Sequence, residues 1–171
     1  MMPGGGIFAL TGLGVALVIA SLLVKAQPIL VWNPTASASR GLYRIAPASG
    51  LQAGDLVLLR PDPASAALYA ERGYLPLGVS LLKRIGALGG MRVCEHAGKV
   101  AINDRHVADA LPIAGRGRPM TPWAGCRTLR DGELFALNAD VPASLDGRYF
   151  GPSLVSSVIG RAVPVWTGKE R

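Results

Sequence analysis

The chain has 171 residues, enough for one globular domain of ordinary size with an N-terminal extension. Half of the residues are hydrophobic, and 22 glycines and 13 prolines favour short strands joined by turns over long helices. The formal net charge of +7 is scattered, without a block of five like charges or a basic and aromatic signature. Nucleic acid is therefore not expected as a partner, and anionic lipid headgroups suit a basic face better.

The N-terminal segment is apolar. Residues 1–24 carry no charged side chain, and residues 7–24 would just span a bilayer core at ~1.5 Å of helix per residue. The segment is either an uncleaved membrane anchor or a secretory signal peptide cut after Ala26. The length of the run and the lack of a preceding Lys or Arg favour the anchor. We therefore divide the chain into residues 1–26, an anchor or signal peptide, and residues 27–171, an exported domain.

The two cysteines agree with export. Cys94 and Cys126 form an even pair, which an oxidising compartment would join as a disulfide. Closing this loop would stabilise the fold by about 3–4 kcal/mol in the chain-entropy model. The alternative is a pair of reduced core thiols. A metal site is not expected, because there is no CxxC and His96 and His106 lie in polar, loop-like segments without ligand spacing.

The remaining elements indicate a mainly β, antiparallel domain with minor helix, after one hydrophobic N-terminal helix. The helix in the domain is predicted to start at Asp62 as N-cap, with Pro63 in its first turn and Gly73 at its end. In chain order we expect an apolar bridge at 27–32, strands at 41–47 and 55–60, and a short helix within 62–75 that stops at Gly73. A strand at 78–88 and a hairpin at 91–107, with turns at 96–99 and 103–105, follow. The chain then has a loop or flap at 110–125 and strands at 132–138 and 158–166.

One lysine stands out in the strand predicted at 78–88. A serine nucleophile needs a base, and neither histidine is placed for that role by its local pattern. A lysine can serve only when it is neutral, which requires apolar surroundings. Lys83 follows two leucines, and strand alternation puts it and Arg84 on opposite faces. Lowering its pKa by about 2–3 units would cost ~3–4 kcal/mol. The alternative is a lysine that snorkels at a sheet edge.

Three motifs then point to one family. "NPTASASRGLY" (33–43), "LLKRIGALGG" (81–90) and "SLDGRYFGP" (144–152) follow one another in the chain. In this order they resemble the motifs of type I signal peptidases, and more narrowly those of the TraF-type conjugative-transfer peptidases that mature pilin precursors. The resemblance spans residues 33–166, after the expected membrane segment. It implies a signal-peptidase-like β-domain in the form of a partly open barrel.

The resemblance also implies roles for the first two motifs. Ser37 matches the nucleophile, since the spacing to Gly41-Leu42-Tyr43 selects it over Ser39. Lys83 matches the general base. Thr35 matches the hydroxyl that forms an oxyanion hole with the Ser37 backbone N–H; the alternative is a turn-forming threonine.

In the third motif, Ser144 matches the serine that orients the lysine amine. Asp146 and Arg148 match an acid and arginine that pair to hold the loop; the alternative is a surface ion pair worth under ~1 kcal/mol. Larger signal peptidases carry a Gly-Asp-Asn-Arg motif upstream of this box, where the chain has "LNADVPAS". The roles of Asn138 and Asp140 therefore stay open.

Together these patterns and the resemblance predict a serine endopeptidase that cleaves an exported pilin precursor. The resemblance also implies cyclisation of the product, and the residues leave cleavage alone and cyclisation as open alternatives. The enzyme would need no cofactor or metal and would act in the bacterial periplasm, at the outer face of the inner membrane. The expected partners are the precursor, inner-membrane lipid beside Trp32, and other conjugative transfer (mating-pair formation) proteins. The first alternative is a non-catalytic exported scaffold of a conjugation or type IV secretion apparatus. The second is a housekeeping signal peptidase, which the small size of the chain disfavours.

Overall fold

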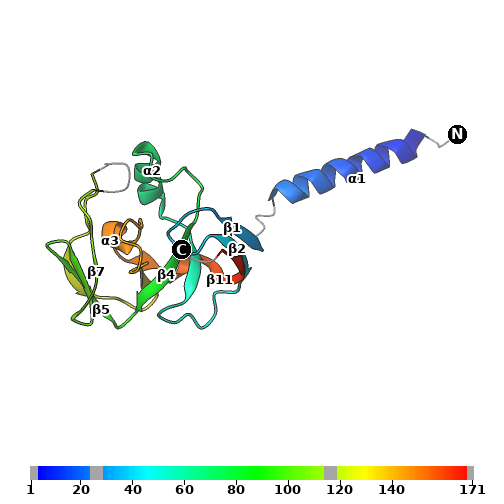
Figure 1. The fold of residues 1–171 in the computed structure, drawn as a ribbon. Coiled ribbons are helices and arrows are strands. Elements are labelled where there is room, and N and C mark those ends of the chain that lie inside the picture. Colours follow the sequence, from blue (N-terminus) through cyan, green and yellow to red (C-terminus); the bar gives the residue numbers. More distant parts are fainter. Residues whose placement is uncertain (1–3, 24–28, 114–118, 169–171) are drawn as a thin grey trace.

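The computed structural model describes residues 4–23, 29–113 and 119–168. Helix α1 (Gly4–Leu23) lies outside the β-domain, and its apolar side chains from Phe8 to Ile19 are exposed (Figure 1). Within the described residues, no helix has both the length and the hydropathy needed to cross a membrane. The anchor or signal peptide at residues 1–26 stays a prediction, and its last residues lie outside those described.

The larger of two sheets has seven strands, and every neighbouring pair in it is antiparallel. It is curled and open, with β1 and β10 at its edges, so the predicted mainly β fold in the form of a partly open barrel is confirmed (Figure 1). Its strands, in spatial order, are β1 (Leu30–Asn33), β2 (Gly41–Ala46), β11 (Val158–Thr167), β3 (Leu56–Leu59), β4 (Leu81–Leu88), β9 (Glu133–Ala136) and β10 (Ser153–Leu154).

The smaller sheet has four antiparallel strands in the order β7-β6-β5-β8. The two turns predicted within the hairpin at 91–107 are confirmed, and they make two successive hairpins. Both turns have positive φ angles: 51° and 80° at residues 97–98, and 48° and 63° at residues 103–104. Such turns match the twist of the strands they join. The strands are β5 (Arg92–His96), β6 (Lys99–Ile102), β7 (Arg105–Asp109) and β8 (Gly125–Thr128).

The cysteines and histidines all lie on or beside this smaller sheet. Cys94 and Cys126 face each other across β5 and β8 and are joined by a disulfide. The placement of the histidines in loops was wrong, since His96 ends β5 and His106 lies in β7, where pairing with β6 overrides their polar local pattern. Among the described residues, no group of three or more His, Cys, Asp or Glu side chains could hold a metal ion.

The predicted helix is α2 (Pro63–Glu71). Asp62 caps it by accepting a hydrogen bond from the Ser65 N–H at 3.0 Å, and Gly73 follows it with a φ of 66°. The helix ends at Glu71, two residues before the predicted stop at Gly73. The strand predicted at 78–88 begins late, at Leu81.

Two further elements were not predicted. The apolar bridge predicted at 27–32 forms strand β1 from residue 30 onward, because its main chain pairs with β2. The third motif contains a short helix, α3 (Gly147–Phe150). Part of the loop predicted at 110–125, residues 114–118, lies outside the described residues.

Strand β4 links the whole core. Its side chains enter all three apolar clusters, with Ala87 in the cluster beneath the smaller sheet, Leu82 beside β2 and β11, and Leu81 beside β9. Since β4 is hydrogen-bonded to β3 on one side and to β9 on the other, its backbone is held in place, and every second residue from Leu81 to Ala87 is buried.

Candidate functional site

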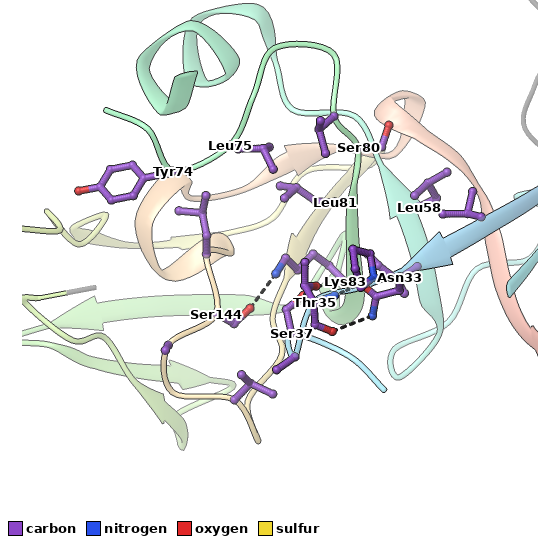
Figure 2. A pocket seen from close by; sticks show the side chains of 18 of the residues that line it. Asn33, Thr35, Ser37, Leu58, Tyr74, Leu75, Ser80, Leu81, Lys83 and Ser144 are labelled. Carbon is purple, nitrogen blue, oxygen red and sulfur yellow. Dashed lines mark hydrogen bonds between the residues drawn. The ribbon is translucent and has the colours of Figure 1, made fainter. Parts of the chain in front are cut away.

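A cleft of about 600 Å³ opens between the loop after β1 and strand β4. Figure 2 shows Thr35, Ser37, Lys83 and Ser144 close together in this cleft, with Tyr74 farther along it. The remaining walls are mostly apolar and are formed by Val31, Trp32, Asn33, Pro34, Ala36, Leu58, Leu75, Val79, Ser80, Leu81, Leu82, Val141, Ala143 and Leu145.

The side-chain amide of Asn33 organises the loop that carries Ser37. Its oxygen accepts hydrogen bonds from the Thr35 N–H at 3.1 Å and from the Thr35 hydroxyl at 2.8 Å. Its nitrogen donates to the main-chain oxygens of Ala38 and Ser39 at 3.0 and 3.2 Å. Because Asn33 is only 5% exposed, water does not compete for these hydrogen bonds. The side-chain amide of Asn33 therefore holds the loop in one conformation.

This arrangement fixes the direction of the Ser37 hydroxyl bond. The Thr35 hydroxyl has one proton, which it donates to the amide oxygen of Asn33, an acceptor only. The contact of 2.9 Å between the Thr35 and Ser37 hydroxyls must then use the Ser37 proton. In the resting site Ser37 therefore donates to Thr35, and Thr35 has no second proton for another acceptor.

Lys83 lies at the buried side of the cleft and is 2% exposed. Its Nζ donates a hydrogen bond of 2.7 Å to the Ser144 hydroxyl (Figure 2). Burial lowers its pKa from the usual 10.5 to about 8; the negative charge of Asp146 opposes this shift, and the positive charge of Arg148 adds to it. The alternative of a lysine snorkelling at a sheet edge is wrong, because β4 is an inner strand and the side chain is buried.

Asp146 and Arg148 form a buried pair behind Ser144. Two hydrogen bonds of 2.9 Å join the guanidinium to both carboxylate oxygens, and the side chains are 0% and 1% exposed. Arg148 also donates to the carbonyl oxygens of Val141 at 2.7 Å and Asp109 at 3.0 Å. The alternative of a surface ion pair is wrong, since the pair is enclosed and holds the segment that ends at Ser144.

The two residues whose roles stayed open differ sharply. Asn138 is 5% exposed and donates from its amide to the Ser37 carbonyl oxygen, whereas Asp140 is exposed. Ser39, the rival hydroxyl, lines a different cavity beside Arg161, and its carbonyl accepts a hydrogen bond from the Tyr43 hydroxyl.

The structure thus brings Ser37, Thr35, Lys83 and Ser144 together, while the disulfide lies on the other sheet. Sequence reasoning assigned no role to Asn33 or Asn138. The one local signal for Asn138 was a polar side chain directly after the apolar run of β9, and Asn33 opens the first motif without any mark of its contacts.

Comparisons with known proteins agree on one family. The family model described as signal peptidase, peptidase S26, matches residues 6–167. The conjugal transfer protein TraF of Agrobacterium fabrum is 36% identical over 148 residues, which cover 79% of this chain and 81% of that protein. A probable conjugal transfer protein TraF of Sinorhizobium fredii is 36% identical over 147 residues, covering 79% and 76%.

Among solved structures, a signal peptidase I from Enterococcus faecalis is similar at 21% identity with a TM-score of 0.40. The match covers 66% of this chain and 97% of that one.

Proposed function

The chain belongs to the signal peptidase family, peptidase S26, and on this premise we propose that it is a serine endopeptidase with Ser37 as nucleophile and Lys83 as general base. The observation that carries this proposal is a buried lysine, with a pKa lowered to about 8, in the same cleft as Ser37. Desolvating an ammonium group does not stabilise a fold, whereas a lysine that acts as a base near neutral pH needs the lowered pKa that desolvation causes.

Catalysis begins with a proton transfer. Neutral Lys83 takes the proton of the Ser37 hydroxyl while Oγ bonds to the carbonyl carbon of the scissile peptide. The resting hydrogen bonds must change first, because Ser37 donates to Thr35 and Lys83 donates to Ser144. Once neutral, Lys83 keeps a lone pair for the Ser37 proton while Ser144 continues to hold its Nζ.

The negative charge that develops on the carbonyl oxygen is stabilised by the Ser37 N–H and the Thr35 hydroxyl. Thr35 can donate there only after its proton turns away from Asn33. The C–N bond then breaks, and the leaving amine takes the proton held by Lys83. This leaves an ester between the substrate acyl group and Ser37.

Two nucleophiles can release that ester. Water gives a linear product and regenerates Ser37. The N-terminal amine of the same polypeptide gives a circular product instead, the outcome implied by resemblance to the TraF-type branch. The names of the relatives support a substrate in conjugation, and we propose an exported pilin precursor cut after small residues at the periplasmic face of the inner membrane.

Co-expression with candidate pilin precursors tests this function through the mass of the product. The wild-type chain should cleave one precursor, and a circular product should weigh one water less than the linear form. Ser37→Ala and Lys83→Ala should leave that precursor uncut, whereas Ser39→Ala should process it normally. Processing by either of the first two variants would reject the assignment of nucleophile and base. A wild type that cuts no precursor would favour the non-catalytic scaffold.

A further inference from the structure

Asn138 lies where the third motif approaches the other two. It follows strand β9, and its own N–H donates to the buried Asp146 carboxylate at 3.1 Å. The side chain is 5% exposed, so its amide groups depend on protein partners rather than on water. The main chain at Asn138 is therefore held by the same buried carboxylate that pairs with Arg148.

The amide oxygen of Asn138 extends the pairing between β9 and β4. The last main-chain bond there runs from the Leu137 N–H to the Arg84 carbonyl at 2.8 Å. The Arg84 N–H then donates to the Asn138 side-chain oxygen, also at 2.8 Å. The side-chain oxygen of Asn138 thus accepts the hydrogen bond that a main-chain carbonyl of a paired strand would otherwise accept. The donor, Arg84, directly follows Lys83.

The amide nitrogen of Asn138 faces the opposite way. It donates to the Ser37 carbonyl oxygen, 101 residues away in the chain, and lies 3.4 Å from the Leu82 carbonyl oxygen. Leu82 precedes Lys83, so this one amide contacts the main chain on both sides of the proposed base. Through its other hydrogen bond it also contacts the main chain of the proposed nucleophile.

We infer that Asn138 is a positioning residue that sets the distance and orientation of Ser37 relative to Lys83. The inference rests on the proposed function, because it gives the two residues a shared reaction. Asn33 shapes the nucleophile loop from within, but only Asn138 among the residues described above ties that loop to β4 through its side chain. Both halves of the amide are needed: an aspartate would keep the bond to Arg84 but could not donate to Ser37.

The test compares Asn138→Ala and Asn138→Asp with the wild-type chain on a cleaved precursor. A loss of alignment of about 1 Å lowers rates up to 100-fold, so kcat should fall about 10- to 100-fold in both variants while KM stays within about twofold. In Asn138→Ala the midpoint of the pH-rate profile should stay near 8, because the burial of Lys83 and its bond to Ser144 do not involve Asn138. A merely destabilised fold would lower the active fraction, not kcat per active site.

Asn103→Asp is the matched control. Its side-chain oxygen also accepts a main-chain hydrogen bond, from the Arg92 N–H at 2.9 Å, in a turn of the smaller sheet. The same exchange of amide for carboxylate should leave kcat unchanged there. Should the alanine variant not fold, Asn138→Asp, which keeps the contact with β4, carries the test.

A crystal structure of each variant gives a readout without activity. We expect Ser37 Oγ to move away from Lys83 Nζ relative to the wild type. If the wild type cleaves no precursor, the proposed function fails, and the displacement alone decides whether Asn138 positions the loop. An unmoved Ser37, or kcat per active site within twofold of the wild type in both variants, would overturn the inference.

Discussion

Lys83 illustrates the conflict between stability and chemistry at the scale of one residue. Its ammonium group is buried among β-strands, where the charged form is disfavoured and the pKa falls to about 8. Below that pH the folded chain must hold a charge that the unfolded chain exposes to water. The difference from the usual pKa of 10.5 corresponds to roughly 3 kcal/mol of unfavourable free energy.

Replacing this lysine should therefore stabilise the chain while removing activity. Between pH 8 and pH 10.5 the unfolded chain binds the Lys83 proton and the folded chain does not, so the free energy of unfolding rises with pH across this window. We expect Lys83→Met to be more stable than the wild type at pH 7, by at least about 1 kcal/mol after the loss of the Ser144 hydrogen bond. Denaturant unfolding at pH 7 and pH 10 measures both effects.

The wild type and Lys83→Met should approach each other in stability at pH 10. Equal stability at pH 7, or a difference in stability that does not narrow as pH rises, would contradict the lowered pKa.

The wild-type kcat/KM should rise with pH through a midpoint near 8, because the neutral amine is the active form.

The sequence indicated Lys83 through a physical anomaly and Ser37 through its resemblance to a family motif. A lysine in an apolar strand is a local anomaly, and the spacing around Ser37 belongs to a short motif. No local sequence pattern indicates the roles of Asn33 and Asn138, because these roles depend on hydrogen bonds from their side chains to main-chain groups of other residues. The Ser37 carbonyl is 101 residues from Asn138, and no local pattern encodes that approach.

At the scale of elements, the segment from β9 to α3 is held by the Asp146–Arg148 pair. The guanidinium contacts both carboxylate oxygens and also reaches the Ser144 carbonyl oxygen at 3.3 Å. Because Ser144 holds the Lys83 amine, the buried pair supports the site indirectly. Of its two charges, the Asp146 carboxylate moderates the fall in the pKa of Lys83, and the Arg148 guanidinium adds to that fall.

Breaking this pair should be costly. Arg148→Met leaves the Asp146 carboxylate buried without its partner, and we expect a loss of about 3–5 kcal/mol in the free energy of unfolding. Arg92→Met is the matched control, since its ion pair with Asp104 is exposed and worth less than about 1 kcal/mol. Denaturant unfolding of both variants at pH 7 measures the difference. Similar losses in the two variants would show that burial of the Asp146–Arg148 pair does not matter.

Alternating and apolar runs predicted strands β2, β3, β4, β9 and β11, and helix α2 was recognised from its cap. Strands β1, β8 and β10 were missed. They lie at sheet edges and are only four, four and two residues long. Their conformation depends on main-chain bonds to one neighbour, as in the pairing of Leu30–Asn33 with β2. Strands β3 and β9 are also four residues long, but most of their side chains are buried and form apolar runs that the sequence shows, whereas β1 has one buried residue and β8 has none.

At the scale of the whole molecule, one exposed apolar surface adjoins the cleft. Trp32 of β1 stacks on Trp166 of β11 with ring centroids 5.8 Å apart, and both remain more than half exposed. Ile29, Leu30 and Val165 beside them are also exposed. We call these five residues the tryptophan face. Trp32 also lines the cleft, so whatever covers this face lies next to the proposed nucleophile.

We expect the tryptophan face to contact lipid, because indole rings favour the membrane interface and β1 is the first strand after α1. Full-length variants that keep only one tryptophan, with Phe at the other two positions, would be reconstituted into vesicles containing brominated lipid. Fluorescence of Trp32 or Trp166 should be quenched. Trp123 is the internal control, since it is half-buried and packs on Phe135 with centroids 6.0 Å apart, so its emission should persist. Equal quenching of all three tryptophans, or quenching of none, would contradict a specific contact between the tryptophan face and lipid.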